Sequence, residues 1–244
     1  MTVTSDHGGK MKRDLVRTML IIGVLLPTCC ERREPVARST ELLRVGTVAE
    51  KTRAAEHLGR ACLSMCERPD DPRLAAIVRD LLTALSDESP EVKEAAARAL
   101  GSAGQAAKPA IADLIRCVKD QDAHVRAGAI NALFTIGSAA SEARACVVAA
   151  LDDKDASVRA IAGRALGRVA PVDQRTPMYV ARLLRDGDEG VRMAALDTLD
   201  ELGALARPAL SEIDRLKNDA DYTVRARARD LSEKLTKTIG KQVN

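Results

Sequence analysis

The feature that most constrains this chain is an internal repeat with a period of 33 residues. A valine followed by a basic residue recurs at that interval, at Val92-Lys93, Val125-Arg126, Val158-Arg159, Val191-Arg192 and Val224-Arg225. Other columns keep the same phase, with an aspartate five residues before each valine and an alanine four residues after it. A period in this range is typical of solenoids, in which each repeat is one supersecondary unit stacked on its neighbours.

Each repeat contains two amphipathic helices. The apolar columns at offsets 0, 4, 8 and 11 from the valine lie on one helical face. A second apolar stripe, such as Ile111-Leu114-Ile115-Val118, precedes each aspartate, and Gly104, Gly137 and Gly203 stand where the helix after the aspartate would end. Because such pairs cannot bury their apolar faces alone, the sequence predicts an all-α fold, an α-α superhelix (solenoid) of stacked helix pairs.

Composition supports this fold and disfavours nucleic-acid binding. The 244 residues include only three aromatic ones, Phe134, Tyr179 and Tyr222. A core of Ala, Leu, Val and Ile suits closely packed helices better than strands, which favour aromatic residues. The near absence of aromatics also argues against stacking on nucleic-acid bases. Beyond the first thirty residues the net charge is near +1, so the body lacks the basic footprint of a nucleic-acid-binding protein.

The repeats set the domain boundaries. We predict a solenoid over residues 41–237, made of one degenerate and five 33-residue repeats, and a C-terminal tail over residues 238–244. The degenerate copy is recognised by Lys51 and Leu58, which match Lys93 and Leu100 at a spacing of 42 residues. Residues 31–40 carry no apolar periodicity and are predicted to form a tether.

Residues 1–30 are predicted to be an export signal. Basic residues are followed by the apolar run Met19–Leu26, whose length suits a signal peptide, whereas a spanning helix needs roughly 20 residues. Ten residues precede Met11, and starting there would give a signal of the usual design, so Met11 is the expected start.

The end of this signal resembles the lipobox of bacterial lipoproteins. In Leu26-Pro27-Thr28-Cys29, Leu26 matches the pattern, whereas Pro27 and Thr28 depart from it. The resemblance implies lipid modification of Cys29, or of Cys30, and thus an exported, membrane-anchored lipoprotein on the extracytoplasmic side. The alternatives are an uncleaved signal anchor, or a cytoplasmic protein for which the N-terminal segment is a spurious extension.

An aspartate and a basic residue six positions apart recur in every repeat and form a periodic ladder. We interpret it as structural, with each aspartate capping the second helix and pairing with the basic residue there or in the next repeat. The alternative is a binding stripe for an acidic partner. The ladder comprises Asp87, Lys93, Asp120, Arg126, Asp153, Arg159, Asp186, Arg192, Asp219 and Arg225.

The repeat itself resembles a known family. The segment from Asp120 to Gly137 looks like a HEAT repeat, similar to the short bacterial kind related to phycobilisome-lyase HEAT-like repeats. The resemblance covers residues 41–237 in five in-phase copies. The Thr-Pro-Leu-His turn of ankyrin repeats is missing, and the chain cannot fill the aromatic positions of tetratricopeptide repeats.

We expect no catalysis, no cofactor and no metal. The chain has no phosphate-binding glycine loop, no Gly-x-Ser-x-Gly elbow and no His-Glu dipeptide of the kind found in the metal-binding HEAT-repeat hydroxylases. A metal site at His57, Cys62 and Cys66 is disfavoured, because His57 and Cys62 would lie about 140° apart around a helix. The numerous acidic residues recur in phase with the repeat, whereas an active site is built once.

The predicted function is a non-catalytic scaffold that docks an unknown protein or peptide. If the second helices line the concave face, as in similar solenoids, positions that vary between repeats form the candidate partner surface. Ile130 and Phe134 are the expected apolar anchors, with packing against the next repeat as the alternative for both. The alternatives for function are a lyase-like or enzyme-associated subunit that holds a substrate protein, and a cytoplasmic adaptor; we expect a monomer. The candidate surface consists of Ile130, Phe134, Arg164, Arg168, Met193, Leu196 and Asp197.

Overall fold

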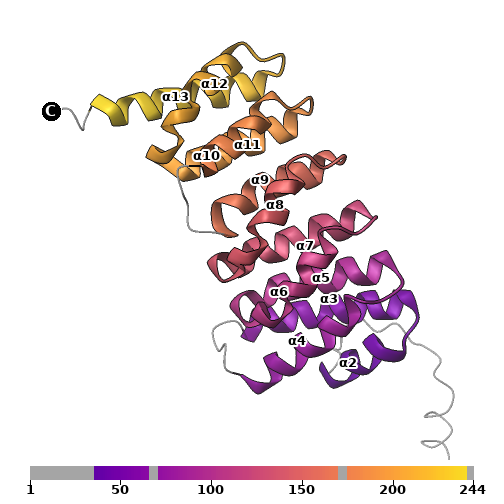
Figure 1. Ribbon diagram of the computed structural model, residues 1–244. Helices are drawn as coiled ribbons and strands as arrows, with labels where there is room; N and C mark the ends of the chain where they lie inside the picture. Colours follow the sequence, from indigo (N-terminus) through magenta and orange to yellow (C-terminus); the bar gives the residue numbers. More distant parts are fainter. Residues whose placement is uncertain (1–35, 66–70, 170–174, 241–244) are drawn as a thin grey trace, which may run out of the picture. The chain divides into compact units, whose positions relative to one another are not determined.

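The 33-residue repeat folds into a row of helix pairs, which confirms the predicted all-α solenoid (Figure 1). The structure, a computed structural model, describes residues 36–65, 71–169 and 175–240. The first helices of the pairs are α2 (Val36–Val45), α4 (Pro72–Ala84), α6 (Ile111–Cys117), α8 (Arg144–Ala150), α10 (Thr176–Arg182) and α12 (Leu210–Arg215). The second helices are α3 (Val48–Met65), α5 (Pro90–Ala103), α7 (Ala123–Ile136), α9 (Ala156–Val169), α11 (Glu189–Leu202) and α13 (Tyr222–Gly240).

Short 3-10 segments complete the first helices. The segments η1 (Gly104–Ala110), η2 (Gly137–Ala143) and η4 (Gly203–Ala209) lead into α6, α8 and α12, whereas η3 (Leu183–Arg185) and η5 (Leu216–Asn218) follow α10 and α12. The first residue of each leading segment is one of the predicted closing glycines. Their φ angles are 53°, 73° and 55°, in the region that favours glycine, so each second helix ends there without backbone strain.

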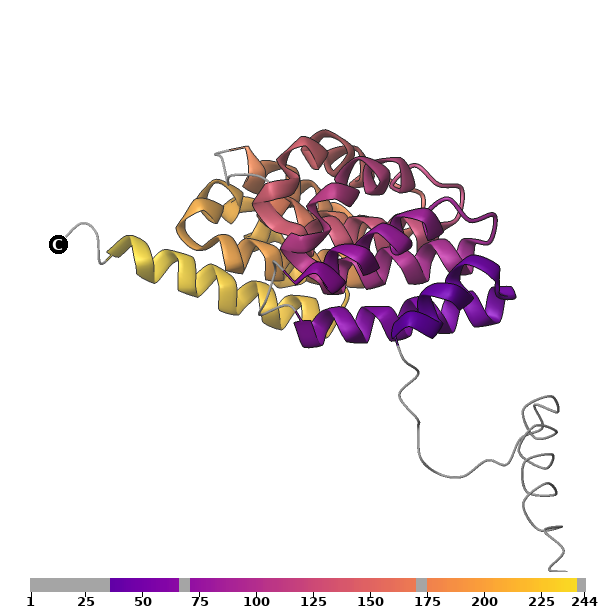
Figure 2. The same cartoon turned by 90° about the horizontal axis from the view of Figure 1, so that it is seen from below.

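The second helices form one continuous layer. Each packs on the second helix of the next repeat, in the order α3, α5, α7, α9, α11 and α13, and also on the first helix of its own pair. Figure 2 shows α13 as a long final helix whose C-terminal part projects beyond the others. A helix in the middle of this layer is therefore contacted on three sides.

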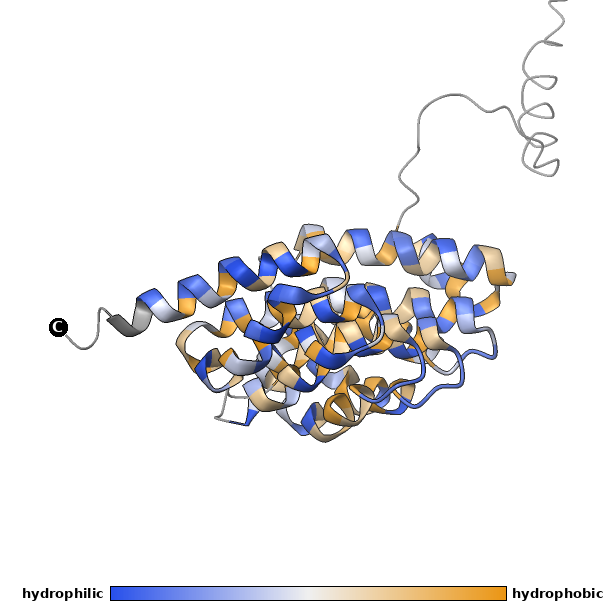
Figure 3. Cartoon of the chain, turned by 90° about the horizontal axis from the view of Figure 1, so that it is seen from above, coloured by the Kyte–Doolittle hydropathy of each residue, from blue (hydrophilic) through white to orange (hydrophobic). Residues whose placement is uncertain are grey.

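The core follows the repeat columns. The five column valines are at most 1% exposed, and the five column alanines four residues later are fully buried. Along each helix, apolar and hydrophilic residues are interspersed (Figure 3). Alanine and branched aliphatic side chains thus fill the core, as the low aromatic content predicted.

Glycines set how closely successive second helices approach. A Cβ atom built on Gly59 would lie 3.1 Å from the Ala99 Cα atom, and one on Gly101 would lie 3.3 Å from the Ala132 Cα atom. At the same repeat offset in α9, a Cβ atom on Gly167 would meet nothing nearer than the Thr198 Cγ2 atom, at 3.7 Å. An added methyl group would therefore press on the neighbouring backbone at the α3–α5 and α5–α7 contacts, whereas the α9–α11 contact has room for it.

Two predicted boundaries differ from the structure. Helix α2 begins at Val36, so residues 36–40 of the predicted tether are part of the fold. The buried Ser39 hydroxyl hydrogen-bonds the Nδ1 atom of His57 at 2.9 Å, and Leu43 is also buried, which fixes α2 against α3. At the other end, α13 continues to Gly240, three residues into the predicted tail. The predicted signal, with Met11, Cys29 and Cys30, lies outside the described residues.

Residues 123–150 have the length and mean hydropathy to cross a membrane, but the structure gives their apolar residues another role. The segment is a helix pair, because α7 ends at Ile136 and the chain turns at Gly137. Ile130, Leu133 and Ile136 are fully buried in the core. The hydropathy of this segment therefore reflects burial within the solenoid.

Replacing Gly59 and Gly167 by alanine should have opposite effects. Gly59→Ala is expected to destabilise the protein by about 1–3 kcal/mol, because the new methyl group would meet the α5 backbone. Gly167→Ala should be neutral or stabilising by up to about 1 kcal/mol, because alanine favours the helix and there is room for it. Urea unfolding measures both changes. Equal destabilisation by the two substitutions would contradict this account of the helix contacts.

Candidate functional site

The ladder residues link each repeat to the next. The carboxylates of Asp120, Asp153, Asp186 and Asp219 each accept a hydrogen bond from the basic residue 27 positions earlier, in the preceding repeat. Arg126 holds Asp153 through both Nε and Nη2, at 2.8 and 2.7 Å, and Arg159 holds Asp186 in the same two-bond manner. Arg192 reaches Asp219 through Nη2 alone, at 2.8 Å. The ladder is therefore a set of cross-links between neighbouring repeats, with Lys93 and Lys51 holding Asp120 and Asp87 at its start.

Each arginine also holds the turn of its own repeat. The Nη1 atom of Arg126 donates to the carbonyl oxygens of Asp120 and Gln121, at 2.9 and 2.8 Å. Arg159, Arg192 and Arg225 make the same two bonds in their own repeats. One guanidinium thus fixes two successive interhelical turns, which a lysine cannot do because it lacks the planar fork.

The ladder aspartates do not cap the second helices, contrary to the prediction. Asp153 accepts the backbone N–H of Asp155 at 2.9 Å, and Asp155 then accepts the N–H groups of Ser157 and Val158 at the start of α9. The other four repeats place the cap two residues after the ladder aspartate in the same way, at Ser89, Asp122, Asp188 and Asp221. The ladder carboxylate is directed instead to the preceding repeat, which corrects the predicted direction of pairing.

Hydrogen bonding keeps the ladder aspartates ionised. Hydrogen bonds from Arg159 lower the pKa of Asp186, against the opposing effect of burial. For Asp153, burial alone would raise the pKa, but hydrogen bonds from Arg126 and from the Asp155 N–H outweigh it and lower the pKa. Because the folded pKa lies below the ordinary value of 3.8, the pairing stabilises the fold above that pH and is lost as the pH falls through the folded value.

The structure divides the predicted partner surface into two groups. Ile130 and Leu196 are fully buried, so their assignment to the surface was wrong. Both lie five residues after a column valine, outside the predicted stripe, but on the side of the second helix that neighbouring repeats cover. The other five residues, Phe134, Arg164, Arg168, Met193 and Asp197, are exposed or half-buried.

Phe134 lies between repeats rather than standing free. It occupies the offset at which α3, α5 and α9 carry glycine, and its half-buried ring packs on the core. The guanidinium of Arg168, on α9, lies over the ring with its Cζ atom 4.9 Å from the ring centroid. Phe134 and Arg168 therefore form a cation–π contact between α7 and α9.

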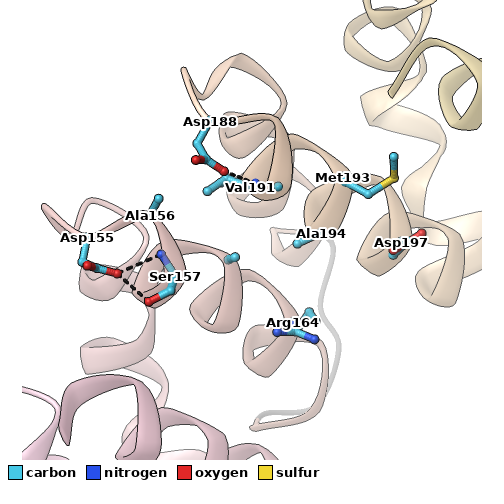
Figure 4. Close-up of a pocket in the computed structure, with 11 residues that line it drawn as sticks. Asp155, Ala156, Ser157, Arg164, Asp188, Val191, Met193, Ala194 and Asp197 are labelled. Atoms are coloured by element: carbon cyan, nitrogen blue, oxygen red, sulfur yellow. Dashed lines mark hydrogen bonds between the residues drawn. The ribbon is translucent and has the colours of Figure 1, made fainter. Parts of the chain in front are cut away.

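The remaining three surface residues line one groove. Arg164 on α9 and Met193 and Asp197 on α11 border an open groove of about 610 Å³ between these two helices (Figure 4). Small residues hollow the surface here, because Gly190 and Ala194 stand where the preceding repeat has Ser157 and Ile161. The sequence showed these substitutions, but only the packing of α9 on α11 reveals that they leave a groove.

The charged residues of the groove differ in whether they have partners. Asp155 and Asp188 cap α9 and α11, and Asp197 accepts the Nε hydrogen of Arg227 at 2.8 Å. Arg164 is exposed and makes no ion pair or side-chain hydrogen bond with any part of the chain that the structure describes. It lies on the α9 wall while Asp197 lies on the α11 wall (Figure 4). The groove therefore presents one cation without an ion pair, three carboxylates engaged by helix N-termini or by Arg227, and an apolar surface of alanines and Met193.

The cysteine and histidine candidates do not form a site in the described residues. The Cys62 thiol is buried, which raises its pKa to about 11, and burial likewise raises the pKa values of Cys117 and Cys146. Such thiols are poor nucleophiles at neutral pH. Within the described ranges no three His, Cys, Asp or Glu side chains gather as a metal site, and Cys66 lies outside those ranges.

Stacked helix pairs joined by a polar ladder define a helical-repeat protein, and sequence comparison gives its family. A profile of HEAT repeats matches residues 48–133, 78–167 and 145–231. The chain belongs to the HEAT-repeat family. A search of curated protein sequences gave no match.

Solved structures share the fold. A designed armadillo-repeat protein in complex with a (KR)4 peptide has a TM-score of 0.64 at 19% identity, covering 83% of this chain and 100% of the other. A HEAT-like repeat protein from the archaeon Thermococcus onnurineus has a TM-score of 0.55 at 19% identity, covering 84% and 88%. The complex of CpcE and CpcF of phycocyanin lyase from a Nostoc species has a TM-score of 0.51 at 22% identity, covering 64% and 98%. At these identities the likeness is one of fold.

Arg126→Ala should be one of the most destabilising changes at the ladder. The pair is largely buried, with 6% of the Arg126 side chain and 13% of the Asp153 side chain exposed, so removing Arg126 leaves a desolvated carboxylate. We expect a loss of about 2–4 kcal/mol at pH 7. The difference from the unaltered protein should shrink below about pH 4, as Asp153 is protonated.

Arg182→Ala is the matched control for this experiment. Arg182 and Asp152 also join neighbouring repeats, but both side chains are more than half exposed. This change should therefore cost about 0–1 kcal/mol. Urea unfolding at several pH values measures both variants. A similar small effect for Arg126→Ala and Arg182→Ala would show that the ladder is not a main source of stability.

Proposed function

We propose that this HEAT-repeat protein is a non-catalytic scaffold that docks a segment of another protein in the groove between α9 and α11. The observation that carries the proposal is the exposed Arg164 beside an apolar floor in a groove of about 610 Å³. Polar groups next to small exposed apolar areas are common in protein interfaces. The second helices, which the sequence predicts to line the concave face, present this groove to the partner.

The chemistry of the groove indicates the kind of segment that it would bind. An aliphatic side chain fits against Ala160, Met193 and Ala194, and a carboxylate of the partner fits the guanidinium of Arg164. The (KR)4 peptide bound by the designed armadillo-repeat protein is basic, whereas the segment proposed here is acidic. The likeness therefore supports peptide binding by this fold, and the charge of the partner is inferred from Arg164 alone.

Selection from a random peptide library displayed on phage, with the full chain as bait, tests this proposal. Enriched peptides should combine acidic and aliphatic residues. Each should bind the Arg164→Glu variant at least about tenfold more weakly, since a lost charged interaction of more than about 1.4 kcal/mol has that effect. Isothermal titration calorimetry measures the affinities, and thermal unfolding shows that the variant is folded.

Lys108→Glu is the matched control. Lys108 is exposed in η1, away from the groove, and this substitution changes the charge by the same amount as Arg164→Glu. Peptides should bind this variant and the unaltered chain equally. If the selected peptides are equally weakened by both substitutions, or by neither, the groove is not their site.

We also propose that the chain is exported and held at the membrane by lipid on Cys29 or Cys30. The lipobox-like Leu26-Pro27-Thr28-Cys29 supports this, and residues 31–35 would then join the lipid to α2. The lyase-like and cytoplasmic alternatives remain predictions of the sequence.

Incorporation of labelled palmitate in a bacterial host tests the lipid anchor. The unaltered chain should be labelled, and the double variant Cys29→Ala/Cys30→Ala should not. The two single variants identify the acceptor. Absence of label in the unaltered chain, when a known lipoprotein in the same cells is labelled, refutes the anchor without affecting the groove.

A further inference from the structure

Arg225, the last ladder arginine, has no aspartate partner among the residues that the structure describes. Arg126, Arg159 and Arg192 each bind the ladder aspartate of the following repeat. In the helix pairs that the structure describes, no turn after α13 brings a carboxylate to Arg225. Among the described residues its guanidinium binds only two backbone carbonyl oxygens of its own turn. Counted with Lys51 and Lys93, the ladder thus has one more basic residue than it has carboxylates.

The fork of Arg225 is held as the occupied forks are. Its Nη1 atom donates to the carbonyl oxygens of Asp219 and Ala220, at 2.6 and 2.9 Å, in the same pattern as Arg126 and Arg159. In those two arginines, Nε and Nη2 bind the carboxylate. The same two atoms of Arg225 remain available. Since the guanidinium is already oriented, a carboxylate can bind without first ordering it.

The surroundings of Arg225 favour an anionic partner. Tyr222 is 72% exposed, and the Arg225 Cζ atom lies 5.8 Å from its ring centroid. Arg229, one turn further along α13, is exposed and donates at 3.4 Å to the carbonyl oxygen of Lys217, which leaves its charge without a carboxylate. The nearby carboxylates are engaged, because Asp219 is held by Arg192 and Asp221 caps α13.

The same end is closed to a further apolar repeat. At the position of Arg229, the internal repeats bury Ala97, Ile130, Gly163 and Leu196. A charged residue there prevents the close apolar contact by which the internal repeats stack. What binds at this end must therefore use charge and the exposed tyrosine ring rather than a helix-pair core.

We propose that Arg225, with Tyr222 and Arg229 beside it, is a carboxylate-binding site for an acidic turn of a partner protein, whose aspartate completes the last rung of the ladder. The site lies at the start of α13 and shares no residue with the α9–α11 groove. It would therefore give the scaffold a second docking point that is independent of the proposed function.

Nuclear magnetic resonance of the full chain with ¹⁵N-labelled arginine tests this site. The probe is a synthetic peptide with the sequence of residues 183–191, which carries the Asp186 turn that Arg159 binds within the protein. The Nε–Hε signal of Arg225 should shift in a saturable manner, with an affinity in the millimolar range. A peptide with Asp186→Asn should shift the Arg225 signal with an affinity that is at least threefold weaker.

An extended chain provides a second measurement that does not depend on weak binding. In it, a second copy of residues 203–235 is inserted directly after Leu235. The original Arg229, which would then face the added repeat, is changed by Arg229→Leu so that this repeat can pack. Arg225→Gln should lower the urea midpoint of the extended chain more than that of the natural chain, and Arg225→Lys should restore only part of the loss. A site of this kind is supported by either specific peptide binding or this difference in midpoint. It is refuted if the aspartate and asparagine peptides act alike and Arg225→Gln has equal effects in both chains.

Discussion

The structure depends on the arginine fork that joins each interhelical turn to the next. A solenoid has no long-range contacts that close it on itself, so its stability rests on contacts within repeats and between neighbours. Apolar contacts between alanine-rich helices are close but non-directional. The bidentate pair between Arg126 and Asp153, anchored on two carbonyl groups, fixes the register of one turn against the next. Because both side chains are largely buried, the pair stabilises the fold only if both charges are present and the hydrogen bonds are well aligned.

Local variation at a few repeat offsets tunes how the second helices pack. Glycine at Gly59 and Gly101 lets neighbouring helices approach closely, whereas Phe134 occupies the same offset in α7 and is covered by Arg168. Small residues at Gly190 and Ala194 then leave a groove between α9 and α11. A regular scaffold thus acquires one distinctive surface through a few substitutions that leave the core columns unchanged.

The predictions from sequence succeeded where the period itself carried the information. The column valines and alanines were assigned to the core, and the three closing glycines to helix ends, because each recurs at a fixed offset. The predictions were wrong for Ile130 and Leu196, since a helix flanked by two others buries more than one stripe. The first five residues of α2 were missed because a short helix with two buried residues shows no apolar period.

The sequence by itself determined the helix-pair repeat, its phase, and the presence of an aspartate and a basic residue in every copy, because these follow from spacing along the chain. It did not determine which aspartate each arginine binds. That choice depends on which turns lie side by side, and stacking brings the carboxylate 27 residues ahead within reach. For the same reason only the tertiary structure revealed the groove at Arg164 and the unmatched fork at Arg225, since both arise from what neighbouring repeats do or do not place beside them.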